Sequence, residues 1–140
     1  MTNRAANIKK VAKLMRDLDF CMMTTNSPDG FRSRPMSNNG EVEFDGDVWF
    51  FSAADSRKVS EIEADAKVQL SYTDLERWLF IAMSGEASII TDVEKKQELW
   101  MKELEQWFED GPESEDVVLL KVTPTQVAWW GKDEQDEVSL

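Results

Sequence analysis

The chain has 140 residues, a common size for one domain, of which 41% are hydrophobic and 10% aromatic. This composition excludes a globally disordered chain, because enough apolar surface is present to offset the loss of chain entropy. The 28 acidic and 16 basic residues give a formal net charge of −12, which excludes electrostatic attraction to nucleic acid or to an anionic membrane.

The chain contains one cysteine, Cys21, and no histidine. A disulfide framework, the usual Cys/His zinc sites and His-dependent nucleophilic catalysis are therefore excluded. Cys21 lies in an apolar run, which predicts a buried side chain that acts as a small hydrophobe. No stretch is long and apolar enough for a transmembrane helix or a signal peptide, so we expect a cytoplasmic protein.

The N-terminal third predicts a helix followed by a β-hairpin. Apolar residues at helical spacing predict a helix over residues 3–18, with Asn3 as its candidate N-cap. The apolar run over residues 20–25 predicts a strand, and the Ser-Pro-Asp-Gly sequence at residues 27–30 predicts a turn. A second strand is expected over residues 31–38.

The middle of the chain predicts a second hairpin and a short helix. Strands over residues 41–44 and 47–52 flank an Asp-Gly pair, the strongest short hairpin pattern in the sequence. Apolar spacing then predicts a short helix that begins near Ser56. Alternating apolar residues predict a strand over residues 67–73.

The next segment predicts a long strand and a long helix. Residues 77–91 are enough for a bent or bulged strand, with Gly85 at the bend. A helix is expected over residues 93–108, capped by the threonine or aspartate before it. Trp100 and Trp107 would lie on its packing face.

Two final strands are predicted over residues 117–122 and 126–130, separated by a Thr-Pro pair. Many short strands with tight turns favour a mainly β fold, an antiparallel barrel of six to eight strands with N-terminal, short middle and longer C-terminal-half helices. We expect one domain over residues 1–131 and a frayed acidic tail over residues 132–140. Such a sheet cannot cover both faces alone, which favours a homodimer.

Two cations open the predicted short helix. If Ser56 or the residue before it is the N-cap, Arg57 and Lys58 lie in the first turn, where each exposed cation costs roughly 0.3–1 kcal/mol against the helix dipole. Backbone N–H groups, a serine hydroxyl and two cations at one point are typical of a phosphate site. The alternative is that both side chains pair with nearby acids such as Glu61 or Asp65.

A second group of cations lies on the strand over residues 31–38. Alternation places Arg32, Arg34 and Met36 on one face of this strand. Arginines in an acidic protein need a partner, and a phosphate is one candidate, with surface salt bridges as the alternative. Pro35 removes a ladder donor, which is typical of an edge strand or a bulge.

Several tryptophans are candidates for contact with a planar ligand. Trp129 and Trp130 alternate to opposite faces, so one of the two at most meets a ligand from a given side. Trp78 follows the turn before the long strand. The alternative for each of them is burial in the barrel core or in a dimer wall.

These residues together resemble the pattern of a known family. Phe51 and Ser52, followed after a short gap by Ser56, Arg57 and Lys58, are similar to the cofactor-binding stretch of the pyridoxamine 5'-phosphate oxidase-like, FMN-binding split barrels. Within this family the chain looks most like the general stress protein 26 branch, over nearly its whole length. The resemblance implies a split β-barrel that binds a flavin.

The resemblance also implies roles for particular residues. Arg57 and Lys58 would bind the FMN phosphate, with the Ser52 hydroxyl in the place of a threonine, and residues 34–36 would face the flavin. The cofactor would be FMN, or alternatively FAD, held at the interface of a homodimer. The full set of expected cofactor contacts is Arg34, Pro35, Met36, Phe51, Ser52, Ser56, Arg57, Lys58, Trp78 and Trp129.

The chain departs from the oxidases where they bind the substrate phosphate. Asn39 stands where the oxidases have a lysine, and Trp78 stands where they have a flavin-contacting glutamine. Their C-terminal Arg-x-His element is replaced by Trp-Trp-Gly at residues 129–131. We therefore predict that pyridoxamine 5'-phosphate oxidase activity is absent.

Three functional hypotheses remain open at this point. The first is an FMN- or FAD-binding protein of general stress type with weak oxidoreductase activity. The second is a non-catalytic flavin reservoir or redox sensor. The third is a split barrel that uses a deazaflavin or no cofactor, while haem is disfavoured because no histidine is available. No side chain is an obvious acid or base, so the catalytic residues are unknown.

Overall fold

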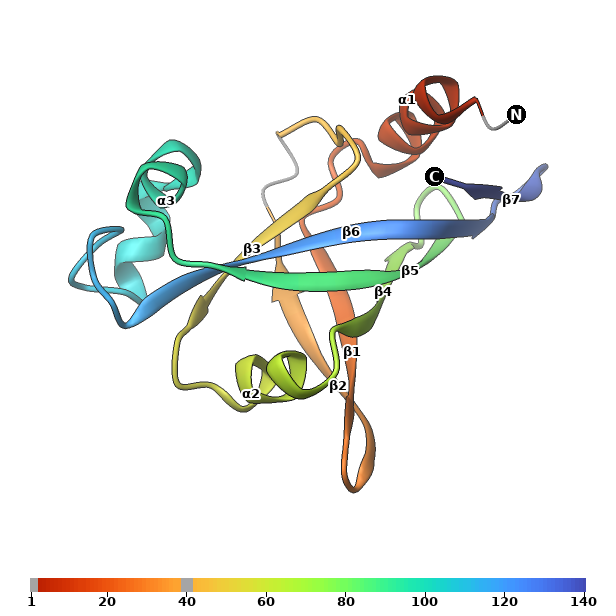
Figure 1. The fold of residues 1–140 in the computed structure, drawn as a ribbon. Coiled ribbons are helices and arrows are strands. Elements are labelled where there is room, and N and C mark those ends of the chain that lie inside the picture. Colours follow the sequence, from red (N-terminus) through yellow and green to blue (C-terminus); the bar gives the residue numbers. More distant parts are fainter. Residues whose placement is uncertain (1–2, 39–41) are drawn as a thin grey trace.

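The computed structural model describes residues 3–38 and 42–140 (Figure 1). Its helices and strands, in chain order, are α1 (Arg4–Met15), β1 (Phe20–Ser27), β2 (Gly30–Ser37), β3 (Val48–Ala53), α2 (Arg57–Ala64), β4 (Lys67–Asp74), β5 (Leu79–Ile90), α3 (Val93–Leu99), the 3₁₀ helix η1 (Lys102–Gln106), β6 (Val117–Trp130) and β7 (Gln135–Ser139).

The strands of the described residues form one antiparallel sheet of seven strands, in the order β2-β1-β4-β5-β6-β3, with β7 also paired to β6. β2 and β3 are the two ends of this path, so the sheet curves into a barrel that is open between them (Figure 1). The prediction of a mainly β, antiparallel split barrel of six to eight strands is confirmed.

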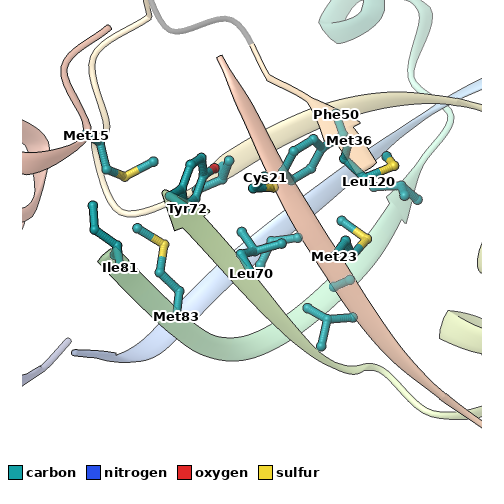
Figure 2. Close-up of a cluster of buried hydrophobic side chains, with 14 of the residues drawn as sticks. Met15, Cys21, Met23, Met36, Phe50, Leu70, Tyr72, Ile81, Met83 and Leu120 are labelled. Carbon is teal, nitrogen blue, oxygen red and sulfur yellow. The ribbon is translucent and has the colours of Figure 1, made fainter. Parts of the chain in front are cut away.

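Alternation along strands such as β1, β3 and β4 builds much of the core (Figure 2). β4 alternates exposed and buried residues, which places Leu70 and Tyr72 inside the barrel with Met23 of β1. Cys21 is buried beside them as predicted, and burial raises the pKa of its thiol to about 12. The inward face of the barrel is therefore apolar along most of its length, which makes polar groups on that face informative.

The first hairpin and the short helix agree with the prediction. Asn3 caps α1, since its side-chain oxygen accepts from the backbone N–H of Ala6 at 3.2 Å. The turn between β1 and β2 is closed by the Ser27 hydroxyl, which donates to the Gly30 carbonyl at 2.7 Å. α2 begins at Arg57 with Ser56 as its N-cap residue.

The predicted second hairpin is wrong. Residues 42–44 form no strand, and Glu41 lies outside the described residues. β3 pairs instead with β6, far along the chain. The physical reason is burial: Phe44 packs into the core at 6% exposure, and β3 finds a longer apolar partner in β6. The chain still bends at Asp45 and Gly46, where Gly46 adopts φ +119°.

The long helix predicted over residues 93–108 is also wrong, because it is broken in two. α3 ends at Leu99, Trp100 and Met101 have extended backbone angles, and η1 follows. The break lets the Trp100 ring meet Phe51 edge-on, with ring centroids 5.2 Å apart. Trp107 is 70% exposed, so it does not belong to a packing face.

The C-terminal region differs from the prediction in two ways. β6 is one strand through Pro124, because the register of β5 shifts at Gly85 opposite this proline. A side chain at Gly85 would collide with the Thr123 carbonyl, so glycine is required where the register shifts. Residues 135–139 of the expected frayed tail form β7, which pairs with β6 and accepts a hydrogen bond from Asn7 of α1.

Candidate functional site

Three polar side chains converge where β3 passes into α2. Ser52 points to the inward face of β3 and is 2% exposed. Its hydroxyl lies 3.1 Å from that of Ser56, and the Lys58 Nζ donates to it, also at 3.1 Å. The Ser56 side chain makes no capping bond to α2, so it stays directed at this cluster. The strand end, the cap and the first helical turn thus form one polar site.

Lys58 is partly buried and lies near another cation. Burial, and to a lesser extent the charge of Arg34, lower the pKa of Lys58 from its ordinary value. No acid lies within ion-pair distance of Lys58 or of the exposed Arg57 in residues 3–38 and 42–140. The alternative that both cations pair with Glu61 or Asp65 is therefore not realised.

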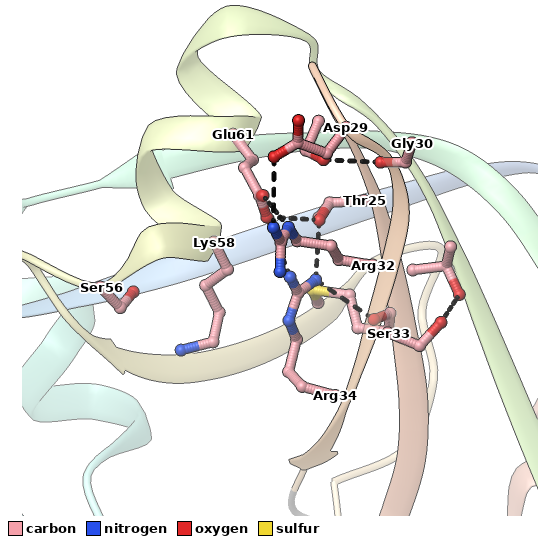
Figure 3. A network of polar contacts seen from close by, with 12 residues as sticks. Thr25, Asp29, Gly30, Arg32, Ser33, Arg34, Ser56, Lys58 and Glu61 are labelled. Carbon is pink, nitrogen blue, oxygen red and sulfur yellow. Dashed lines mark hydrogen bonds and ion pairs between the residues drawn. The ribbon is translucent and has the colours of Figure 1, made fainter.

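Arg34 is held by groups from two neighbouring elements (Figure 3). Its Nη1 donates to the Met23 carbonyl at 3.2 Å and to the Thr25 hydroxyl at 2.8 Å. Its Nη2 donates to Glu61 of α2 at 2.9 Å. The guanidinium is thus fixed at the barrel opening, on the side where Lys58 lies.

Residues 34–36 were predicted together, but their side chains have three different environments. Arg34 enters the polar cluster, and Pro35 is exposed on the outer surface opposite Met22. The Met36 side chain is 7% exposed and packs in the core. Only the first of the three side chains lies at the cation cluster.

Phe51 lies on the other face of β3 from Ser52. Its ring contacts Trp100, and it lines a cavity of about 290 Å³ bounded by α1, β3 and the α3–η1 segment. Most of the lining is apolar, including Phe44, Trp49 and Met101. β3 therefore separates a polar site on one face from an apolar cavity on the other.

Trp78 and Trp129 lie far from this cluster within one copy of the chain. Ser52 pairs with Val118 near the start of β6, and Trp129 is eleven residues further along the same strand, about 36 Å of extended backbone. Trp78 adjoins the start of β5, which pairs with the far end of β6. Trp129 is 1% exposed, whereas Trp130 is 44% exposed, as their predicted opposite faces require.

Thr25 and Glu61 belong to the cluster, although the sequence analysis did not propose them as site residues. The Thr25 hydroxyl donates to Glu61 at 2.8 Å, and both side chains are buried. One pattern in the sequence could have indicated Thr25, since it follows Cys21 and Met23 on the inward positions of β1. Glu61 had no such pattern, because acids are abundant throughout the chain.

The described residues contain neither a metal-ion cluster nor a helix suited to cross a membrane. No group of three or more Cys, His, Asp or Glu side chains within them could hold a metal ion. Among their helices, none has the length and apolar character that crossing a membrane demands.

The fold matches known proteins over nearly all of its length. The general stress protein 26 of Bacillus anthracis str. Sterne superposes with a TM-score of 0.81 at 21% identity, covering 96% of this chain and 98% of that one. A Clostridium acetobutylicum protein related to general stress protein 26 gives 0.81 at 17% identity, covering 97% and 96%.

A third structure has the same fold. A pyridoxamine 5'-phosphate oxidase-related, FMN binding protein of Nostoc punctiforme gives a TM-score of 0.73 at 17% identity, covering 98% of this chain and 89% of that one. Among curated proteins, none matches the sequence. The sequence profile described as "Pyridoxamine 5'-phosphate oxidase like" matches residues 6–139. The chain therefore belongs to the pyridoxamine 5'-phosphate oxidase-like family.

Proposed function

We propose that this protein binds FMN, with the flavin phosphate held by Lys58 and Arg57 and by the hydroxyls of Ser52 and Ser56. One observation carries the proposal: Lys58 is partly buried, faces Arg34 and has no acidic partner in the described residues. Burial and a second cation disfavour the charged form of Lys58, and an anion bound beside it would offset this cost. The Nostoc relative described as FMN binding has the same fold, which supports a flavin as that anion.

The charges of the site suit a terminal phosphate. A phosphate monoester carries about −1.5 to −2 charges at neutral pH. Lys58 and Arg57 are two cations without ion-pair partners in the part of the chain that is described. This match favours FMN over FAD, whose phosphates are diesters that each carry a single charge. A bound flavin would supply hydride-transfer chemistry, and the side chains named here would hold and orient it.

We propose a homodimer that uses the outer face of the sheet. Apolar side chains are exposed on two of its strands, with Phe20 at 68% and Met22 at 43% on β1 and Trp130 at 44% on β6. Trp78, 55% exposed, stacks edge-on against Phe80, which pairs with Trp130. Exposed apolar residues gathered on one face are typical of an interaction surface. In such a dimer, Trp78 of one copy could approach the phosphate site of the other copy.

The absence of pyridoxamine 5'-phosphate oxidase activity remains our prediction, together with a location in the cytoplasm. Asn39, which replaces the substrate-binding lysine, lies outside the described residues. The C-terminal residues that replace the Arg-x-His element are otherwise engaged: Trp129 is buried, and the segment after it returns as β7.

A titration with FMN and with riboflavin tests the proposed function. The two ligands share the ring and ribityl chain and differ in the phosphate, so the phosphate site predicts tighter binding of FMN by ten-fold or more, on the scale of about 1.5–3 kcal/mol for hydrogen bonds to a charged group. Flavin fluorescence quenching gives both dissociation constants. Equal affinities, or no binding of FMN, would refute the assignment. Oxidation of NADH or NADPH by the FMN-loaded protein then separates an oxidoreductase from a flavin reservoir.

A further inference from the structure

Glu61 is a buried carboxylate between the two arginines of β2. Its side chain is 7% exposed on the inner face of α2 (Figure 3). Oε1 accepts from Arg34 Nη2 at 2.9 Å, and Oε2 lies 3.5 Å from Arg32 Nε. The Thr25 hydroxyl completes its contacts at 2.8 Å. Among the residues that the structure describes, the side-chain partners of this carboxylate thus come from β1 and β2.

The same carboxylate fixes which way Arg34 points. Arg34 donates to one carbonyl and one hydroxyl of β1 and to Glu61, so three acceptors define the plane of its guanidinium. Buried ion pairs often add little net stability, because both charges lose their hydration. The geometry they impose is the effect that matters here, and it keeps Arg34 turned toward α2 and β1.

The charges of the arginines and carboxylates around Glu61 balance, whereas the charge of Lys58 beside them is not balanced by an acid of the described residues. Arg32 and Arg34 face two carboxylates, those of Glu61 and of Asp29, which lies 3.5 Å from Arg32 Nη2. Lys58 has only the Ser52 hydroxyl as a bonding partner among the described residues. The positive charge left for an incoming anion therefore lies at the start of α2 and not on β2.

We infer that Glu61 is a positioning residue that holds Arg34 as a charge-compensated neighbour of the anion site, so that Lys58 and Arg57 bind the phosphate. This inference rests on the proposed function. It assigns Arg34 to the wall of the site, with its hydrogen bonds already made within the protein.

Glu61→Gln tests the inference, because glutamine keeps the size of the side chain and removes its charge. Arg34 then becomes available to the anion, and we expect FMN and inorganic phosphate to bind roughly three- to tenfold more tightly at low salt. The affinity should also fall more steeply with added NaCl than in the unmodified protein. A role for Glu61 in stability alone would lower the melting temperature without tightening the binding.

Glu63→Gln is the matched control, since Glu63 is exposed on the same helix and loses the same charge. The affinity of the Glu63→Gln variant for FMN and phosphate should stay close to that of the unmodified protein. If Glu61→Gln binds no more tightly than this control, the inference is overturned, while the proposed function stands as long as FMN binds more tightly than riboflavin to the unmodified protein.

Arg32→Gln decides the matter if Glu61→Gln does not fold. Arg32 lies on an edge strand, and its side chain is 38% exposed, so this variant should fold. Removal of the Arg32 guanidinium leaves the negative charge of Glu61 less compensated. We therefore expect phosphate to bind about two- to threefold more weakly at low salt. Unchanged phosphate affinity in Arg32→Gln would overturn the inference.

Discussion

The two faces of β3 show how adjacent residues can serve different purposes. Ser52 points inward and meets Lys58 and Ser56, where polar groups interrupt the apolar interior. Phe51 points outward and packs against Trp100 beside an apolar cavity. Because side chains of a strand alternate, one step along the chain separates the candidate site from a packing surface.

Proximity in sequence is a poor guide to which residues share the candidate site. Phe51 and Ser52 are neighbours in the predicted motif but face away from each other. Glu61 and Thr25 are distant from each other in sequence and are joined by a 2.8 Å hydrogen bond. Substitutions on the two faces should therefore separate stability from binding.

The largest effect is expected for Phe51→Ala. Loss of the ring and of its contact with Trp100 should lower the free energy of unfolding by roughly 3 kcal/mol, the lower part of the range for such truncations. Denaturant unfolding monitored by tryptophan fluorescence measures this change in the free energy of unfolding. Trp107→Ala is the control, because Trp107 is 70% exposed and should change stability by less than about 0.5 kcal/mol. If folded Phe51→Ala also loses FMN, both faces of β3 belong to the site.

A smaller effect on free energy, confined to binding, is expected for Lys58→Ala. Removal of the ammonium should weaken FMN by about 1.5–3 kcal/mol, the range for hydrogen bonds to charged groups, with little change in riboflavin affinity. Isothermal titration calorimetry with both ligands provides the measurement. Lys67→Ala, at an exposed position of β4, is the matched control. An unchanged FMN affinity in Lys58→Ala would place the phosphate elsewhere.

The smallest effect is a pH dependence of FMN binding. Burial and Arg34 lower the pKa of Lys58, and a bound phosphate would raise it again. Below the lowered pKa the ammonium is already charged and the affinity is full. As the pH rises through that pKa toward the ordinary value of 10.5, binding must take up a proton, so affinity falls by at most about tenfold per pH unit. The dependence should vanish in Lys58→Met, and its persistence there would assign it to another group.

Local patterns predicted most elements with clear start and stop residues. The Asn3 cap, the turn at residues 27–30, α2 and β4 all follow from nearest neighbours in the sequence, and all are observed. The helix break at Trp100 and the pairing of β3 with β6 did not follow, because distant residues decide them. Phe51 gives Trp100 a packing partner that an unbroken helix pattern does not reveal.

The candidate site shows the same division. The positions of Ser52, Ser56 and Lys58 could be predicted, because a strand end, a cap and a first helical turn are close in sequence. Trp78 and Trp129 were predicted from alignment to a pattern, and the structure places them at the far ends of β5 and β6. Trp129 is buried there, and a contact of Trp78 with a flavin would depend on a second copy of the chain, which one sequence does not display.

By itself, the sequence determined the family, the strand-rich character and the two cations that open α2. These depend on composition, on alternation and on residues a few positions apart, where short-range sterics and the helix dipole dominate. Only the tertiary structure decided that Glu61 pairs with Arg34 and that no acid of the described residues pairs with Lys58. Charge pairing depends on distances through space, and the barrel sets those distances by closing β1 and β2 against α2.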